Sequence, residues 1–253
     1  MSLHTGTLAF AIFATFFVAG LVKGVLGMGL PTVVMGFLGL AMPPAQAAAL
    51  MVVPSFITNV WQLWVGPSLW VLVKRTAAMH LGVVVGIVMT IGLLTSSVVT
   101  YALASLGLVL ALYGLLGLTP VKFVVPPRAE WWLAPLVGLS SGAIAGATGV
   151  FVIPAVPYLN SLGLKRDELI QVLGLSFAVS TTTLAIALSF TGHFHWHTAG
   201  ASALALLPAL AGMFVGQKVR YRLRPDTFRR VFFIGLIVLG LYILVRALQS
   251  ALR

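Results

Sequence analysis

The sequence predicts an all-α polytopic membrane protein built from two inverted repeats, each a broken, re-entrant helical hairpin plus three transmembrane helices. The observations behind this class are a membrane-like composition, two apolar segments interrupted by glycine and proline, and similar halves. Hydrophobic residues make up 60% of the 253 residues and charged residues 8%, and the mean hydropathy is +1.10. Soluble domains carry about 25% charged residues. Long continuous apolar runs favour helices, because the strands of a barrel would show short alternating segments.

The composition also excludes several kinds of site and partner. The chain has no cysteine, which excludes disulfides, thiolate nucleophiles and Cys-ligated metals. Its net charge of +11 would suit nucleic acid, but basic loops in a membrane protein are first a topology signal, so no nucleic acid is expected. The four acids all fall in segments expected to be loops: Glu130, Asp167, Glu168 and Asp226. No carboxylate is therefore expected inside the membrane to bind Na⁺ or relay protons.

The first apolar segment, residues 8–40, is too long and too rich in glycine and proline for one straight span. One span needs about 20 apolar residues, and interior glycine or proline costs a helix about 1 or 3 kcal/mol relative to alanine. The interrupting residues are Gly20, Lys23, Gly24, Gly27, Gly29 and Pro31. A break at membrane depth frees backbone polar groups, which are tolerated only beside a protein-lined or water-filled cavity.

The second half repeats this pattern in residues 131–162. Its interrupting residues are Gly138, Gly142, Gly146, Gly149 and Pro154. Two broken segments in matching halves are typical of secondary transporters, whose substrate site lies between the repeats. Glycines four residues apart also allow close helix packing, and both interpretations can hold together.

The chain divides into residues 1–118, a linker at 119–130, and residues 131–253. We expect spans at about 46–65, 76–94 and 98–118 in the first repeat, and at about 169–190, 198–216 and 231–245 in the second.

Basic residues decide between two topologies, because they favour the cytoplasmic side of short loops. If each broken segment simply crosses, the eight-span protein divides its loop Lys and Arg five against eight. If each is a re-entrant hairpin, twelve of the fifteen lie on one side, and only Lys23, Arg246 and Arg253 are left over. We therefore prefer the inverted arrangement, with both termini outside the cytoplasm.

Lys23 is the charge that lies deepest in an apolar run. Helix from Leu8 to Lys23 rises about 22 Å, which places the ammonium well inside a core about 30 Å thick. Such a charge costs about 2.5–3.5 kcal/mol and usually faces a functional cavity. The alternative is that the long side chain reaches an interface. We favour the functional role; the counterpart in the second half is Ser141.

Polar side chains follow each broken segment at helical spacing. Ser55, Asn59 and Gln62 are repeated as Ser176, Ser180 and Thr183. Such groups can donate to an oxyanion, as can the N-terminal ends of half-helices; the alternative is hydrogen bonding between helices. The candidate substrate-binding residues are Lys23, Gly24, Gly27, Gly29, Pro31, Asn59, Gln62, Ser141, Gly146, Thr148, Gly149, Ser180 and Thr183.

No metal or cofactor is expected. His193, His195 and His197 alternate in a short segment and could bind a metal or titrate, but an interfacial loop without further ligands explains them better. The basic run 217–230 is interpreted as a cytoplasmic anchor that touches anionic lipid headgroups.

These motifs resemble those of the sulfite exporter TauE/SafE family. The resemblance rests on residues 20–31 (GLVKGVLGMGLP), on the glycines from Gly138 to Gly149, and on Leu38-Gly39-Leu40 repeated as Leu162-Gly163-Leu164. It implies transport of small sulfur oxyanions or organosulfonates, such as sulfite or sulfoacetate, across a bacterial inner membrane.

The expected function is secondary transport of a small anion in the lipid bilayer, with export preferred and the oligomeric state open. One alternative is proton-coupled uptake of an organic anion, with a histidine or the substrate itself carrying the proton. Another is a membrane subunit that anchors a partner through its basic loop. An enzyme is the least favoured class, because neither a carboxylate nor a cysteine is expected within the membrane.

Overall fold

Ten helices account for most of the computed structural model, which describes residues 2–96, 99–119, 124–220 and 225–251. In chain order they are α1 (Ser2–Leu26), α2 (Leu30–Leu38), α3 (Pro44–Val65), α4 (Leu69–Leu94), α5 (Val99–Leu118), α6 (Pro127–Thr148), α7 (Ala155–Asn160), α8 (Arg166–Phe190), α9 (Trp196–Arg220) and α10 (Pro225–Ala251). No strand occurs in these ranges. Within the described residues, seven helices are long and apolar enough to cross a membrane, namely α1, α3, α4, α5, α8, α9 and α10. The all-α, multi-pass class is confirmed.

Both predicted breaks are present, and glycine makes each of them. Gly27 and Gly29 separate α1 from α2 with φ angles of 78° and 102°, a left-handed conformation that costs other residues energy. Pro31 lies in the first turn of α2, where a missing N–H costs nothing. Gly149 ends α6 in the same way, with φ 73°.

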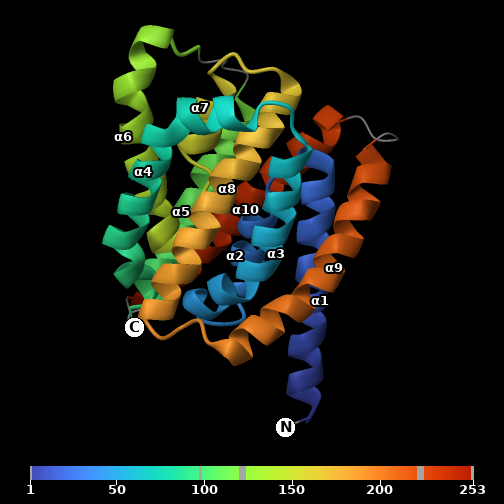
Figure 1. Ribbon diagram of the computed structural model, residues 1–253. Coiled ribbons are helices and arrows are strands. Elements are labelled where there is room, and N and C mark those ends of the chain that lie inside the picture. The colour runs from blue at the N-terminus through green and yellow to red at the C-terminus, as the bar shows by residue number, and fades with distance from the viewer. Residues whose placement is uncertain (1, 97–98, 120–123, 221–224, 252–253) are drawn as a thin grey trace.

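The other glycines pack helices together. A Cβ added to Gly20 on α1 would overlap the Ala209 carbonyl oxygen on α9, and one added to Gly138 on α6 would overlap that of Met79 on α4. These two pairs of helices, α1 with α9 and α4 with α6, lie at opposite sides of the bundle (Figure 1). α5 packs along α10, and α3 along α8. Some glycines therefore break helices, and others, such as Gly20 and Gly138, let helices pack closely.

The two termini lie at the same end of the molecule (Figure 1). At the other end, Arg75 of α4 forms an ion pair of 2.6 Å with Glu130 of α6 and donates to the Leu162 carbonyl. The starts of α4, α6, α8 and α10 and the end of α9 lie at this end (Figure 1). We call it the basic end, because these helix ends carry most of the described cations: Lys74, Arg75, Arg128, Lys165, Arg166, Lys218, Arg220, Arg229 and Arg230. Lys122, Arg222, Arg224 and Arg253 lie outside the described residues. The cations thus gather at one end, as the re-entrant interpretation requires.

Several helices are longer than the expected spans. Lys74 and Arg75, expected in a loop, lie in α4, while α9 continues to Arg220 and α10 begins at Pro225. The acids likewise lie in first turns of helices rather than in loops, Glu130 in α6, and Asp167 and Glu168 in α8. Hydropathy ends a span at the first charges, but long basic side chains extend helices into the interface, and carboxylates stabilise helix N-termini.

We predict that Gly138→Ala destabilises the protein by about 1–3 kcal/mol, because the added methyl group meets backbone that cannot move aside. Unfolding by SDS in mixed micelles, followed by circular dichroism, measures this. Gly235→Ala in α10 is the matched control, since an added Cβ there meets nothing within 4 Å and alanine favours the helix by about 1 kcal/mol. Equal stability of the two variants would contradict the packing role of Gly138.

Candidate functional site

Lys23 is buried inside the bundle instead of reaching an interface. Its side chain, only 3% exposed, lies in the last turn of α1. The Nζ group donates a hydrogen bond to Oδ1 of Asn59, which is also buried in α3. Its partner is thus a neutral amide, and no carboxylate among the described residues pairs with it.

Gln62 lies one turn beyond Asn59 on the same face of α3 and holds the break itself. Its Nε2 donates to the Gly27 carbonyl at 2.6 Å, which satisfies a backbone group that the helix has released. The Asn59 Nδ2 and Gln62 Oε1 atoms are buried without a hydrogen-bond partner among the described residues. A free amide N–H therefore lies on the same side chain that accepts from Lys23.

A cavity of about 490 Å³ begins at these residues and leads to the basic end. Its inner part is lined by Lys23 and Gly24, which are buried, and by Gly27 and Gln62, which are half-buried. Asp167, Gln217 and Arg220, from the start of α8 and the end of α9, line its mouth. The volume lies within the range of about 300–1,000 Å³ that is usual for small-molecule sites.

The charges of the cavity favour an anion. Lys23 and Arg220 contribute two cations against the single carboxylate of Asp167. Asp167 is exposed at the mouth, where water and salt screen its charge, whereas the ammonium of Lys23 is shielded from solvent and its field is screened far less. The inner wall is therefore electropositive, and an anion there would complete the coordination of Lys23.

The structure brings together only part of the predicted site. Gly29 and Pro31 begin α2 just beyond the cavity and do not line it. Asn59 does not line it either, and lies behind Lys23 as the partner of its hydrogen bond. The candidates of the second half do not line it either: Ser141, Gly146, Thr148, Gly149, Ser180 and Thr183. The second break instead packs against the first hairpin, because Gly149 faces Met35 of α2.

Hydrogen bonds and packing show what most of the second-half residues do. Thr183 Oγ1 donates to Val179 O, within its own helix, and Thr148 Oγ1 donates to Ile144 O. Gly146 packs against Ile87 of α4. Ser141, the counterpart of Lys23, is buried with no hydrogen-bond partner among the described residues.

Sequence reasoning missed the far wall of the cavity and a buried histidine. Gln217 and Arg220 belong to the run interpreted only as a lipid anchor, and their place in a cavity follows from the packing of α9 on α1.

His80 of α4 is buried, and its Nε2 lies 2.9 Å from Ser176 Oγ on α8. A lone histidine in an apolar run was the available signal. In the described ranges, no three His, Asp or Glu residues converge as they would at a metal site.

Comparison with known proteins gives one match. The family model described as "Sulfite exporter TauE/SafE" matches residues 12–243, which include both helix breaks and the cavity residues named above. No curated protein and no solved structure matches the chain.

The cavity mouth yields a prediction about orientation that the cysteine-free chain makes easy to test. Gln217→Cys, at the basic end, should react with a membrane-impermeant maleimide in inside-out vesicles only, because basic ends face the cytoplasm. Ser250→Cys, exposed near the end of α10, should react in right-side-out vesicles only. Labelling of both cysteines from one side would rule out the re-entrant topology.

Proposed function

Because the chain belongs to the sulfite exporter TauE/SafE family, a family of membrane transporters, we propose that it is a secondary transporter for a small anion. Sulfite or an organosulfonate is the proposed substrate, the bacterial inner membrane the proposed location, and export the proposed direction. The substrate binds in the cavity that begins at Lys23.

One observation carries this proposal: the buried ammonium of Lys23 has a neutral amide as its partner. A structural lysine inside a membrane protein normally finds a carboxylate, and none of the four acids of this chain lies near the middle of a helix. A sulfonate or sulfite oxygen would accept from Lys23 and from the free Nδ2 of Asn59, and such charge-assisted bonds are about twice as strong as neutral ones.

Pseudo-symmetry supports the inverted repeat. The contact of Gly20 in α1 with Ala209 in α9 has a counterpart in the contact of Gly138 in α6 with Met79 in α4. Helices in equivalent places of the two halves correspond: α1 to α6, α4 to α9, and α5 to α10. Inverted repeats let a transporter open a single site to either side by exchanging the conformations of its halves.

Export of an anion needs no coupled ion. An inside-negative potential contributes about 2.3 kcal/mol per 100 mV to the outward movement of each negative charge. The described acids lie in the first turns of α6 and α8, away from the centre of the bundle. This placement agrees with a carrier driven by potential alone.

His80 favours a second candidate, proton-coupled uptake of an organic anion. It is a buried titratable group bridged to α8 through Ser176, which itself donates to Val172 O. Uptake driven by a pH gradient, and abolished by His80→Gln, would establish this function in place of export.

Proteoliposomes loaded with radiolabelled sulfite and given an imposed potential test the proposal. Lys23→Met keeps the length and helix propensity of the side chain and removes its charge. We expect efflux to fall about tenfold or more, since a charge-assisted hydrogen bond contributes about 1.5–3 kcal/mol. Lys218→Met, on the exposed side of α9 and outside the cavity, is the matched control and should keep wild-type flux. Full flux in Lys23→Met would remove Lys23 from transport.

Asn59→Asp tests the same site from its other side. The new carboxylate would pair with the Lys23 ammonium and neutralise the inner wall, so we expect a folded protein whose sulfite efflux falls as far as in Lys23→Met. Circular dichroism establishes the fold, and efflux establishes the function. Undiminished efflux would show that the positive charge is not what binds the substrate.

A further inference from the structure

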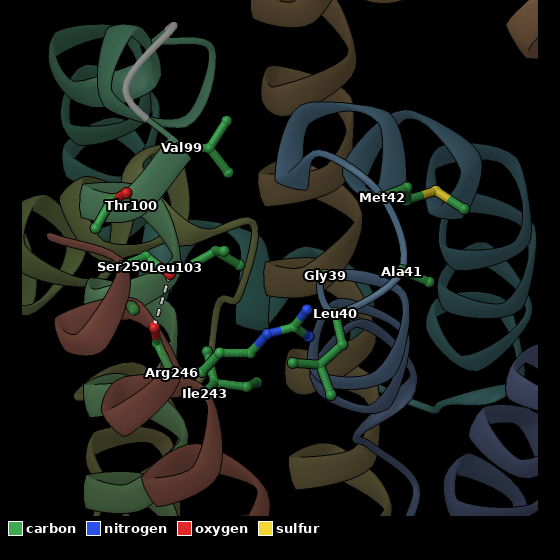
Figure 2. Close-up of a pocket in the computed structure, with 11 residues that line it drawn as sticks. Gly39, Leu40, Ala41, Met42, Val99, Thr100, Leu103, Ile243, Arg246 and Ser250 are labelled. Carbon is green, nitrogen blue, oxygen red and sulfur yellow. Dashed lines mark hydrogen bonds between the residues drawn. The ribbon is translucent and has the colours of Figure 1, made fainter. Parts of the chain in front are cut away.

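A second pocket lies at the opposite end of the molecule from the Lys23 cavity. It has a volume of about 360 Å³ and lies between the segment after α2, the start of α5 and the end of α10. Gly39 and Leu40 line one wall, Thr100 another, and Arg246 and Ser250 the third (Figure 2). Nothing in the proposed function assigns a role to this pocket.

Among the described residues, Arg246 is the one charged residue that lines this pocket. The side chain extends from α10 toward Gly39 and Leu40 (Figure 2), but it forms no hydrogen bond or ion pair with any residue that the structure describes. The acids of the chain lie at the starts of α6, α8 and α10, at the basic end.

The position of Arg246 is unusual for its charge. Arg246 is exposed and lies at the opposite end of the molecule from most of the described cations, where positive residues are disfavoured. Its side chain crosses toward the α2 segment within the pocket instead of pointing along α10 into the surroundings (Figure 2).

The first broken segment connects the two pockets. Gly27, at the start of the break, lines the Lys23 cavity, and Gly39, just after α2, lines the Arg246 pocket. Between them lies α2, nine residues long, which corresponds to about 13 Å of helix.

We propose that the Arg246 pocket is a second binding site for a small oxyanion, at the face opposite the Lys23 cavity; this inference rests on the proposed function. A guanidinium presents paired N–H donors that match sulfite, sulfonate or phosphate oxygens. The Thr100 hydroxyl, which forms no hydrogen bond with a described residue, adds a further donor in the pocket. The site receives the transported anion on its way across.

A lipid phosphate has the same chemistry as a free oxyanion, so the test must separate the two sources. Full-length protein is purified in dodecyl maltoside, which contains no phosphate, and sulfite binding is measured by isothermal titration calorimetry. We expect two sulfite sites per wild-type chain and one in Arg246→Gln. Arg246→Lys should retain a weaker second site, and Arg230→Gln, an exposed arginine at the other end of the same helix, should retain both.

A side-specific transport measurement completes the test. In vesicles where the Arg246 end faces the medium, Arg246→Gln should raise the apparent KM for external sulfite about tenfold, and in vesicles of the opposite orientation the KM should not change.

Two results would overturn the inference: two intact sulfite sites in Arg246→Gln, or equal changes in KM from both faces. The first of these, together with loss of bound phosphatidylglycerol, would identify a lipid site instead. If Arg246→Gln loses one sulfite site while Lys23→Met binds sulfite as the wild type does, the Arg246 site is supported and the proposed role of Lys23 is contradicted.

Discussion

The contact between the Lys23 ammonium and the Asn59 amide is the interaction on which the functional interpretation of this structure depends. A buried cation in a membrane protein is expensive unless something polar surrounds it. Here the protein supplies an amide oxygen and leaves an amide N–H unused beside it. The arrangement stabilises the charge without neutralising it, as a site that must bind and release an anion requires.

The break in the first hairpin makes this contact possible. Continuing the helix through Gly27 would leave no gap beside Lys23, and a break without Gln62 would leave the Gly27 carbonyl without a partner in an apolar environment. Asn59 and Gln62 therefore act together on α3. Asn59 accepts a hydrogen bond from the Lys23 ammonium, and Gln62 donates one to the Gly27 carbonyl. Gly20 and Gly24 of α1 let α9 approach closely enough to close the cavity.

The two halves use one architecture for different tasks. The second break has the same glycine chemistry as the first, yet Gly149 faces Met35 of α2 instead of the Lys23 cavity. Thr148 before this break and Thr183 of α8 each donate a hydrogen bond within their own helix. Ser141, in the place of Lys23, carries no charge. The asymmetry of charge in the sequence thus corresponds to an asymmetry in where the cavity lies.

By itself the sequence determined the membrane class, the two breaks and the gathering of cations at one end, because these depend on composition and on local backbone cost. It favoured a cavity for Lys23 but left open that its long side chain reaches an interface. It also placed Asn59 and Gln62 on one face, because helical spacing fixes that. Only the tertiary structure decided that Asn59 meets Lys23 and that Gln217 and Arg220 complete the cavity, while Ser180 and Thr183 do not line it. Spacing defines the face of a helix but not which helix lies against it; that depends on close contacts such as Gly20 with Ala209, between residues far apart in the chain.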